Sequence, residues 1–556
     1  MFDLAKFRNL FSILSVVFNE ERDVLNALDA AVGDGDHGFT VSRAFTAVMR
    51  SLPNDADDLG SLLDAAAKTL AESAGGAIGP LLAAFFAEGG LLLRGKQDCT
   101  AADLAQFFAG GMKAVMQVGG AQPGQKTMLD AIQPAVDALK SQLFDSPVTA
   151  LLAAEDAAQV GALSTREMVA VHGRAHFLGE RSKGYQDAGA TSFALIVRCF
   201  REAAQGITRQ PADDQTAADG FRPSGKFTNH PDDMVAEDNE GLALAHPHIV
   251  SYLPEGFMVR AKPKESGKVG LAIGHGGGHT PSMGGLVGHG LLDSDVYGPI
   301  FTCASGVKIG RAIELAEHGA GVALLISNHA GDVLNARLGM RRATQLGIQV
   351  EAVHLGDDIA TAPREAFEQR RGLGGLLFAL KTGGAAAEAG LSLAEVARLM
   401  RSTNQRTATL AVAVRPPTHP ATGIPLFEMP SGQVEIGTGV HGEVGVYRGE
   451  LLPADQIVDL LLDRLLADLS TLLGKQVLVF INGSGGTSQM ELNILYRRAH
   501  HKLLTQGFSI AGSVVNSLFT TQEMGGFSLS LCAVDQELEY WWQQPAASVN
   551  FRWPMV

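Results

Sequence analysis

Three aspartates near the N-terminus have the spacing of a site for a hard cation. Asp29, Asp34 and Asp36 lie within eight residues, in a glycine-rich turn that ends with His37. Such a cluster is electrostatically unfavourable alone and becomes favourable around Mg²⁺, which prefers oxygen ligands and bridges carboxylates to nucleotide phosphates. Asp and Gly are also ordinary turn residues, so a solvated turn is the alternative. The third aspartate and the histidine favour metal binding.

Three further clusters combine glycine with histidine or aspartate in the second half of the chain. They are Gly274-His-Gly-Gly-Gly-His279, Asn328-His-Ala-Gly-Asp332 and Gly437-Thr-Gly-Val-His-Gly-Glu443. An imidazole can add to a ketone as a nucleophile, and a carboxylate can take the proton of a substrate hydroxyl. His279, Asp332 and His441 suit this chemistry. A metal site is the rival interpretation, but no segment with helical spacing carries His-x-x-x-His or His-Glu-x-x-His.

Other glycine-rich strings have simpler interpretations. G-x-G-x-x-G occurs at Gly33 and at Gly437. The segment before Gly33 has helical spacing, and aspartates in the turn would repel a pyrophosphate, whereas no helix clearly opens after Gly437. The chain lacks G-x-x-x-x-G-K-[ST], which excludes an ordinary P-loop. A strand-to-helix turn is the preferred interpretation of 483–487. His289, His318 and His354, taken singly, are interpreted as polar turns or satisfied core histidines.

Two halves with different patterning must position these residues. Residues 1 to about 205 have the apolar spacing of helices, whereas 206–225 is polar, contains two prolines and is a linker candidate. Beyond the linker, short apolar runs that end in glycine clusters alternate with helical segments; these runs are 269–273, 322–326, 350–355 and 477–481. This alternation predicts an α/β fold with a largely parallel sheet, in which ligands bind beyond the carboxyl ends of the strands.

Composition narrows the class of protein. Of the 556 residues, 46% are hydrophobic and 19% are charged, which excludes a disordered chain. A net charge of −15 predicts no nucleic-acid partner. The four cysteines lie far apart and predict neither a disulfide framework nor a zinc site. The longest uncharged apolar stretch in the first third, 73–87, is too short to span a membrane, so we expect a cytoplasmic protein without membrane association.

The first half resembles the nucleotide-binding (DhaL-type) domain of dihydroxyacetone kinases over about residues 5 to 205. In the order of the family, the acidic turn is followed by Ser73–Pro80, by the Pro-Gly-Gln-Lys-Thr-Met turn at 123–128 and by the segment 174–189. The resemblance implies an eight-helix barrel with ATP at one end, where the three aspartates hold two Mg²⁺ ions. By position it implies nucleotide contacts from His37, Thr40, Ser73, Gly119, Met128, Arg174, Asp187 and Gly189.

The second half resembles the substrate-binding (DhaK-type) domain of the same family over about residues 240 to 555. The resemblance rests on the three glycine clusters. It implies that His441 binds the substrate carbonyl as a hemiaminal and that Asp332 is the base on the terminal hydroxyl. His279, Gly276 and Gly277 are then expected to support the substrate, with His279 near the bound oxygen.

Several positions depart from the pattern of the family. Its glycine loop usually reads Gly-Gly-Gly-Ser-Gly-His-Glu-Pro, whereas here His275 replaces a glycine, Gly277 the serine and Thr280 the glutamate. Ser327 stands where a lysine is common. The order of the domains is also reversed, because the single-chain kinases place the substrate domain first. These departures leave the ketose open among dihydroxyacetone, erythrulose, apulose and similar sugars.

Together the two halves predict a multidomain ketose kinase. We expect an all-α DhaL-like domain at 1–207, a linker at 208–225 and a DhaK-like α/β domain of two subdomains at 226–556. The expected ligands are ATP, Mg²⁺ and a small ketose, and the expected assembly is a homodimer. Two alternatives remain: a phosphotransferase-system kinase that uses bound ADP as a relay, and a non-catalytic ketose sensor or co-regulator.

Overall fold

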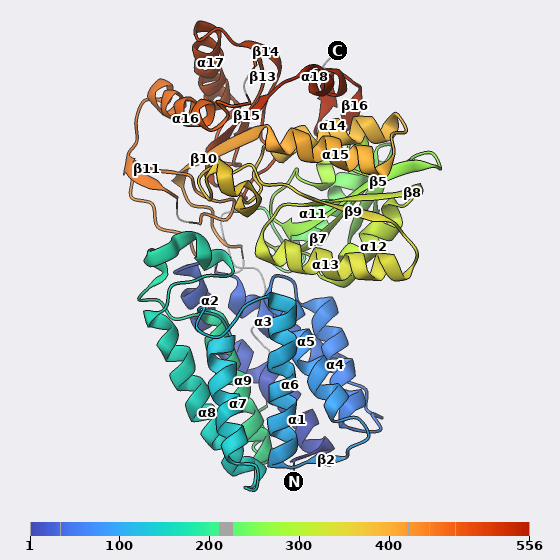
Figure 1. Ribbon diagram of the computed structural model, residues 1–556, viewed down its shortest axis with the longest axis vertical. Helices are drawn as coiled ribbons and strands as arrows, with labels where there is room; N and C mark the ends of the chain where they lie inside the picture. The colour runs from blue at the N-terminus through green and yellow to red at the C-terminus, as the bar shows by residue number, and fades with distance from the viewer. Residues whose placement is uncertain are drawn as a thin grey trace. The chain divides into compact units, whose positions relative to one another are not determined.

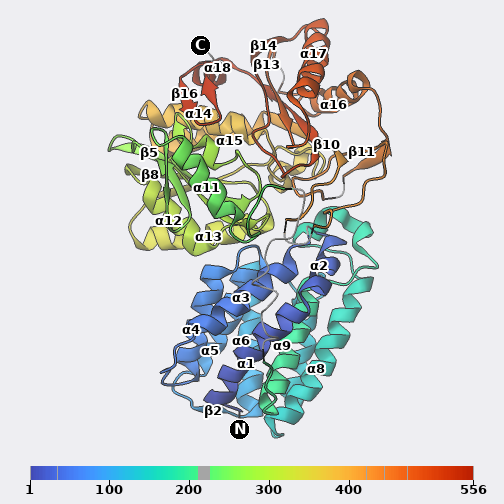
Figure 2. The same ribbon diagram turned by 180° about the vertical axis from the view of Figure 1, so that it is seen from behind.

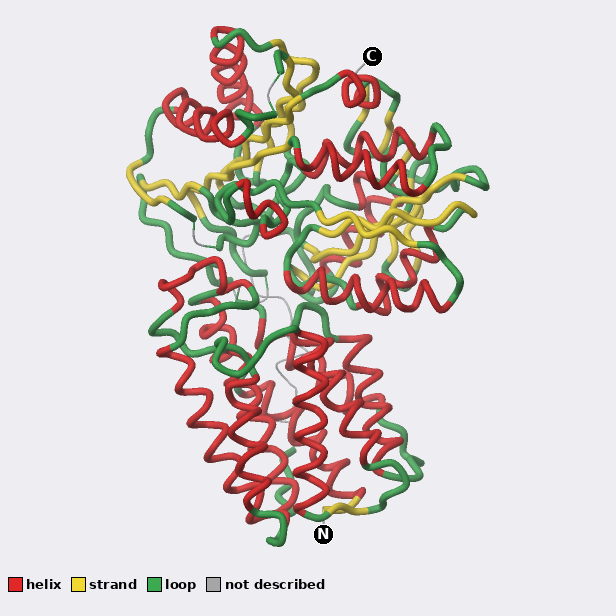
Figure 3. The backbone as a smooth tube through the Cα atoms, viewed as in Figure 1, coloured by secondary structure: helices red, strands yellow, loops and turns green. Residues whose placement is uncertain are grey.

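Two compact units make up the chain. The computed structural model describes residues 2–33, 35–210, 226–420, 423–443, 445–472 and 474–554. The units divide between Gly220 and Phe221. The first is almost entirely helical, and the second mixes strands with helices (Figure 3). Most of the expected linker, 211–225, lies outside the described residues.

Nine α-helices form the described part of the first unit. They are α1 (Leu4–Glu20), α2 (Arg22–Ala30), α3 (His37–Ser51), α4 (Leu59–Ser73), α5 (Ile78–Leu92), α6 (Ala101–Gly119), α7 (Leu129–Ser141), α8 (Pro147–Ser164) and α9 (Ala188–Ala204). Two 3₁₀ segments, Thr165–Glu167 and Arg174–Ser182, precede α9, and a short antiparallel pair joins β1 (Phe2–Asp3) to β2 (Asp98–Cys99). From α3 to α9 each helix packs against the next, and α1 packs against both α3 and α9 (Figure 1).

Phenylalanine fills the interior of this helical unit. The apolar spacing at the start of the chain predicts a helix, and α1 forms there and buries Phe7, Leu10, Phe11 and Leu14. Eleven phenylalanine rings without solvent exposure touch one another in a continuous series: Phe2, Phe7, Phe11, Phe18, Phe45, Phe85, Phe86, Phe107, Phe108, Phe193 and Phe200. Aromatic side chains bury large areas, so this cluster dominates the core of the unit.

The alternating directions of the helices bring the sequence motifs to one end of the unit. The turn between α2 and α3, the turn between α4 and α5, and the starts of α7 and α9 all lie opposite the β1–β2 pair (Figures 1 and 2). The short helix α2 contacts α3 and α9 at this end. The acidic turn follows helix α2 and precedes helix α3. The helix before the turn was predicted from the sequence, and it excludes a dinucleotide-binding fingerprint, which follows a strand.

The first six-stranded sheet of the second unit has the order β3-β4-β7-β5-β8-β9. Its strands are β3 (Val250–Leu253), β4 (Phe257–Arg260), β5 (Lys268–Gly277), β7 (Ser294–Ile300), β8 (Gly319–Ile326) and β9 (Val350–His354). β7, β5, β8 and β9 run parallel. Helices α12 (Gly306–Ala316) and α13 (Ala330–Gln345) cover one face, and α14 (Leu376–Glu388) and α15 (Leu393–Gln405) cover the other (Figure 1). Helix α11 (Met234–Ala245) packs on β3 and β7.

The second six-stranded sheet corrects the expectation of a largely parallel sheet. Its order is β12-β11-β10-β15-β13-β14, and only β13 and β14 are parallel. The strands are β10 (Thr407–Arg415), β11 (Gln433–Ile436), β12 (Tyr447–Glu450), β13 (Gln476–Gly483), β14 (Ser509–Asn516) and β15 (Gly525–Ala533). Helix α17 (Gln489–Thr505) makes the crossover from β13 to β14. No helix separates β14 from β15, and a short loop returns the chain antiparallel to β13.

Helix α14 joins the cores of the two sheets. Residues Leu376 to Ala387 are all buried. They share one hydrophobic cluster with β5, with Phe480 of β13 and with Trp542 of α18 (Gln536–Trp542). Helices α16 (Ala454–Asp468) and α17 pack against the opposite face of the second sheet. A small sheet of β6 (Gly288–His289), β16 (Ala546–Ser548) and β17 (Arg552–Trp553) completes the unit.

Candidate active site

Three loops of the second unit carry the histidines and the aspartate singled out by sequence. His279 follows the carboxyl end of β5. Asp332 lies in the first turn of α13, which follows the carboxyl end of β8. Because β5 and β8 are parallel neighbours, both residues lie at the same edge of the first sheet. His441 comes from the loop between β11 and β12 of the second sheet.

The structure brings His279 and His441 into direct contact. Their Nε2 atoms lie 3.1 Å apart and their ring centroids 5.0 Å apart. The ring of Phe301 packs against both, at 5.6 Å from His279 and 5.5 Å from His441. His329, the residue before α13, has its ring 6.0 Å from that of His441. Loops from both sheets therefore meet at a cluster of imidazoles.

Hydrogen bonding fixes the proton of His279. Its Nδ1 lies 2.6 Å from the carbonyl oxygen of Thr520, which can only accept, so Nδ1 carries the hydrogen. Burial lowers the pKa of His279 well below its usual value, and the charges of His441, His275 and His329 lower it further. His279 is therefore neutral near pH 7 and presents a lone pair at Nε2 to His441.

Asp332 has one occupied and one open oxygen. Ser327 donates its Oγ hydrogen to Asp332 Oδ2 at 2.7 Å. Oδ1 is buried and has no hydrogen-bond partner within the described part of the chain. An open carboxylate oxygen can accept a hydrogen bond from a substrate hydroxyl. Ser327 is the residue that stands where the family has a lysine, so the partner of the aspartate here is a neutral hydroxyl.

Gly276 and Gly277 are required by packing within the protein. A Cβ at Gly276 would lie 2.9 Å from the carbonyl carbon of Phe301, and one at Gly277 would lie 2.4 Å from Val235 Cγ2. Larger residues would therefore displace the backbone or helix α11. This packing explains both glycines without a ligand, so their expected contact with substrate stays a prediction.

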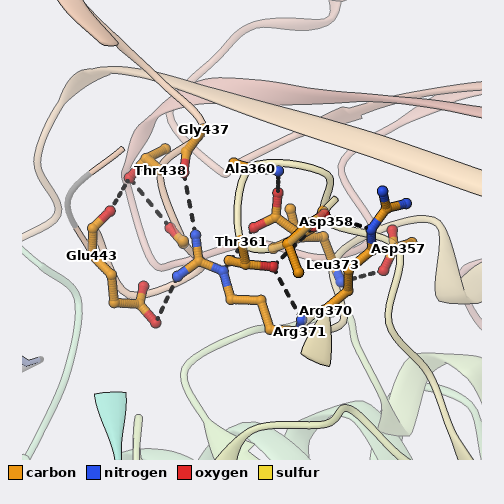
Figure 4. A network of polar contacts seen from close by, with 12 residues as sticks. Asp357, Asp358, Ala360, Thr361, Arg370, Arg371, Leu373, Gly437, Thr438 and Glu443 are labelled. Atoms are coloured by element: carbon orange, nitrogen blue, oxygen red, sulfur yellow. Dashed lines mark hydrogen bonds and ion pairs between the residues drawn. The ribbon is translucent and has the colours of Figure 1, made fainter. Parts of the chain in front are cut away.

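A buried ion-pair network contacts His441 through Glu443. Figure 4 shows its members Glu443, Arg371 and Asp358. Glu443 Oε2 accepts a hydrogen bond of 2.9 Å from the backbone N–H of His441, and Oε1 lies 3.6 Å from His441 Nδ1. Arg371 lies 3.6 Å from Glu443 and 2.7 Å from Asp358. Sequence reasoning missed Arg371, although an Arg370-Arg371 pair at the start of an otherwise apolar stretch is a signal for buried charge.

The acidic turn of the helical unit folds around Asp29. Asp29 Oδ2 accepts hydrogen bonds from the backbone N–H groups of Gly35 at 2.9 Å and of Asp36 at 3.1 Å. A Cβ at Gly33 would lie 2.6 Å from Asp29 Oδ1, so a glycine is needed there. Asp34 lies outside the described residues. The carboxylates of Asp29 and Asp36 thus come from one tight turn.

His37 and Asp187 lie beside this turn. His37 Nε2 is 3.0 Å from Ser192 Oγ, whose own hydrogen is donated to the carbonyl of Gly189. Burial lowers the pKa of His37, although Asp29 raises it. Burial also raises the pKa of Asp187 to about 7, and the charge of Asp29 adds to this effect. Four predicted site residues, Asp29, His37, Asp187 and Gly189, therefore interact electrostatically or through shared partners.

The other residues that are expected to contact the nucleotide lie at or near the ends of helices and 3₁₀ segments of this unit. Met128 approaches Gly189, since a Cβ there would lie 3.6 Å from the Cβ of Met128. Thr40 is buried one turn into α3, after Asp36 and His37. Ser73 ends α4 and donates to the carbonyl of Thr69. Gly119 ends α6 and Arg174 begins a 3₁₀ segment.

Two charged residues that hold the 123–128 turn, Lys126 within it and Asp130 in the first turn of α7, were not predicted as site residues from the sequence. Lys126 Nζ donates to the carbonyls of Thr165 at 2.6 Å and Tyr185 at 2.5 Å. The carboxylate of Asp130 accepts from the backbone N–H of Thr127 at 2.7 Å. Both side chains thus hold the turn itself. They were missed because a single Lys or Asp is a weak signal in a sequence.

The donor set at the acidic turn fits Mg²⁺ that arrives with phosphates. Carboxylate oxygens are the protein ligands that Mg²⁺ prefers, and it usually keeps one or two of them beside substrate phosphates. Within the described ranges, which omit Asp34, no group of three His, Cys, Asp or Glu side chains is arranged to hold a metal by itself. Asp29 and Asp36 therefore suit an ion that the nucleotide helps to bind.

Among the described helices, none is long and apolar enough to cross a membrane.

Comparison with protein families identifies both units. The Dak1 domain matches residues 240–550, which is more than half of the chain, and the DAK2 domain matches residues 31–202. The chain belongs to the dihydroxyacetone kinase family. The DAK2 domain precedes the Dak1 domain, as the sequence motifs predicted.

Curated relatives of this family member are ketose kinases and their subunits. The L-erythrulose kinase of Pectobacterium atrosepticum is 38% identical over 328 residues, which is 58% of this chain and 55% of that protein. The D-erythrulose kinase of Mycolicibacterium smegmatis is 36% identical over 60% of this chain and 56% of that protein. The chain thus spans little more than half the length of these kinases. A dihydroxyacetone-binding subunit DhaK of a PTS-dependent kinase from Listeria innocua is 35% identical over 56% of this chain and 95% of that protein.

Solved structures of the family share the fold. The dihydroxyacetone kinase of C. freundii, in complex with AMP-PNP and Mg²⁺, is 29% identical with a TM-score of 0.54, over 59% of this chain and 60% of that chain. The dihydroxyacetone kinase operon co-activator DhaQ is 30% identical with a TM-score of 0.53, over 56% of this chain and 97% of that chain.

Proposed function

We propose that this chain transfers a phosphoryl group from ATP to a terminal hydroxyl of a small ketose. The observation that carries the proposal is the pair of imidazoles, His279 and His441, whose Nε2 atoms lie 3.1 Å apart within the region that matches the Dak1 domain. The erythrulose kinases among the relatives support a ketose as substrate. The ligands of the C. freundii structure support ATP and Mg²⁺.

The proposed chemistry uses one residue for each task. His441 Nε2 adds to the ketone carbon and holds the substrate as a hemiaminal. His279 faces the same nitrogen and supports the oxygen of the former carbonyl. Asp332 Oδ1, which has no hydrogen-bond partner in the described structure, takes the proton of the terminal hydroxyl as its oxygen attacks the γ-phosphorus. Gly276 and Gly277, at the end of β5 near His279, are proposed to contact the substrate.

The helical unit is proposed to bind the nucleotide. Asp29, Asp34 and Asp36 would hold Mg²⁺, as two ions in the pattern of the family, and these cations would neutralise charge on the phosphates. The expected nucleotide contacts are His37, Thr40, Ser73, Gly119, Met128, Arg174, Asp187 and Gly189. The order of helix contacts, in which α1 touches both α3 and α9, supports an eight-helix barrel around this site. A homodimer and the boundaries 1–207, 208–225 and 226–556 are part of the same proposal.

The test is a coupled assay of ADP release over ketoses of three to six carbons, with the products mapped by NMR. We expect turnover of one or more ketoses phosphorylated at a terminal hydroxyl. Asp332→Asn should lower kcat by about 10²- to 10⁴-fold, which is the usual contribution of a general base. Wild-type protein that releases no phosphorylated product from any ketose refutes the proposal, and near-normal kcat in the variant refutes the role of Asp332.

A phosphotransferase-system kinase is the second candidate. The match to nearly the whole DhaK subunit from Listeria innocua favours it. Such an enzyme would keep ADP bound and would need a separate phosphohistidine protein to recharge it. Purified chain that turns over repeatedly with free ATP excludes this candidate. Ketose binding without any product in either assay would instead favour a co-regulator, for which the likeness to DhaQ is the supporting observation.

A further inference from the structure

Glu443 is placed to control the protons of His441. Its carboxylate reaches back within its own loop, where Oε2 accepts the backbone N–H of His441 and Oε1 faces Nδ1 of the ring at 3.6 Å. Gly439 makes this possible, because a Cβ there would lie 2.0 Å from Glu443 Oε2 and 2.5 Å from the guanidinium of Arg371. The Gly-x-Gly-x-His-Gly-Glu string is thus explained by an ion pair beneath the histidine.

Arg371 keeps this carboxylate charged and in place. Its Nε donates to Asp358 at 2.7 Å and a terminal nitrogen donates to the carbonyl of Gly437 at 3.2 Å (Figure 4). The side chains of Arg371, Asp358 and Glu443 are 2%, 0% and 9% exposed, so none of them can swing into solvent without opening the fold. Burial alone would raise the pKa of Glu443, but the charge of Arg371, the contact with His441 and the charge of His329 together hold this pKa well below the usual range.

Different groups face the two ring nitrogens of His441. On one side, the lone pair of His279 Nε2 faces Nε2 of His441. On the other side, a carboxylate faces Nδ1. A lone pair on Nδ1 would be repelled by that carboxylate, so when His441 gives up one proton, the proton that stays is the one on Nδ1. Nε2 is then the nitrogen left with a lone pair.

We propose that Glu443, paired with Arg371, is a positioning residue that retains the proton of His441 on Nδ1 and thereby makes Nε2 the nucleophile toward the ketone. This inference rests on the proposed capture of a ketose by His441. In the step, the proton on Nε2 passes to His279 Nε2. The freed lone pair forms the bond to the carbonyl carbon, the π pair moves to the carbonyl oxygen, and His279 returns the proton to that oxygen. The N–H and C=O are replaced by N–C and O–H, so charge and atoms balance.

The same geometry predicts how pH acts on the adduct. The charged and titratable groups that face His441 are His279 from the β5 loop, His329 before α13, Glu443 from its own loop and Arg371 behind Glu443. Among the described residues, Glu443 is an anion that faces the ring at 3.6 Å, and it favours the protonated imidazole. Its removal should therefore move the pH midpoint of adduct formation downward by about 1 unit, as for the loss of an opposite charge at this range.

The experiment compares Glu443→Gln with Glu435→Gln in the full chain. Glu435 is also buried in this region, accepts from the backbone N–H of Gly445 at 2.6 Å and pairs with Arg448, and therefore controls for loss of a buried charge beside the same loop. The probe is dihydroxyacetone labelled with ¹³C at the carbonyl, added without nucleotide. Conversion of the ketone carbon to a saturated carbon bound to nitrogen and oxygen is read by ¹³C NMR between pH 5 and pH 9.

We expect wild type and Glu435→Gln to form the adduct with the same pH midpoint. Glu443→Gln should form at least about tenfold less adduct near pH 7, because the loss of a carboxylate that fixes a histidine tautomer is costly, and its midpoint should lie lower. Arg371→Lys, which keeps the cation, should retain more adduct than Arg371→Met if both remain folded by circular dichroism. Unchanged adduct and midpoint in Glu443→Gln refute this inference. Absence of adduct in wild type refutes the covalent capture itself.

Discussion

Replacing Lys381 by methionine should stabilise the second unit, most strongly at low pH. Lys381 lies in the buried stretch Leu376 to Ala387 of α14, and its Nζ donates to the carbonyl of Trp541 at 3.1 Å. Burial lowers its pKa from 10.5 to about 7. The unfolded chain therefore binds this proton more tightly than the folded chain does. Below pH 10.5, protonation of Lys381 lowers the free energy of unfolding.

The size of the effect follows from the difference between the two pKa values. At about 1.4 kcal/mol per pKa unit, the buried ammonium destabilises the fold by about 5 kcal/mol at pH 6 and by about 2 kcal/mol at pH 9. Stability contributed by this group rises as pH rises from about 7 to about 10.5. Lys381→Met removes this term and loses one hydrogen bond, worth about 1 kcal/mol at every pH. The net gain is therefore about 4 kcal/mol at pH 6 and about 1 kcal/mol at pH 9.

Tryptophan fluorescence measures this gain selectively. The three tryptophans of the chain, Trp541, Trp542 and Trp553, all belong to the second unit. Urea unfolding of wild type and variant is followed at pH 6 and pH 9, and the free energy of unfolding is taken from midpoint and slope. Other titrating groups are common to both proteins and cancel in the comparison. A variant that is less stable at pH 6, or a gain that is equal at both pH values, refutes the reasoning.

Two further predictions concern other buried charges. Burial raises the pKa of Asp187 to about 7, so its contribution to stability falls as pH rises from about 4 to 7. Asp187→Asn should therefore protect the amides of α9 at pH 8 more than at pH 5, measured against wild type by hydrogen exchange; equal protection at both pH values contradicts this. Asp468→Ala should destabilise the second unit by about 3–5 kcal/mol in urea, because the unexposed guanidinium of Arg370 loses its partner. Asp455→Ala, which breaks an exposed pair, should cost less than about 1 kcal/mol.

Local patterns were sufficient to predict many elements. The apolar runs at 269–273, 322–326 and 477–481 became β5, β8 and β13, because uninterrupted apolar stretches are typical of strands buried on both faces. The run at 350–355 became β9, an edge strand that is only partly buried. The turn at 483–487 joins β13 to α17, as interpreted from sequence. Each of these patterns is contained within about a dozen residues, so it can be recognised without knowledge of long-range contacts.

Long-range pairing could not be predicted in the same way. Thr520, which fixes the proton of His279, lies 241 residues away in sequence, and its carbonyl has no side-chain signature. Arg371 meets Gly437 across 66 residues. The antiparallel second sheet also depends on partners far along the chain. The sequence therefore indicated candidate residues for the chemistry, whereas the groups that set their protonation became visible only in the fold.

The phenylalanine core of the helical unit has a consequence for ligand exchange. Because eleven interlocked rings fill the space between α1, α3, α5, α6 and α9, a ligand cannot pass through this core without breaking aromatic packing. A nucleotide bound as proposed at the acidic turn is therefore expected to arrive and leave at the end formed by the turns. Its residence time should depend on rearrangement of short loops, a fast local motion, and remain insensitive to changes that only stabilise the helices.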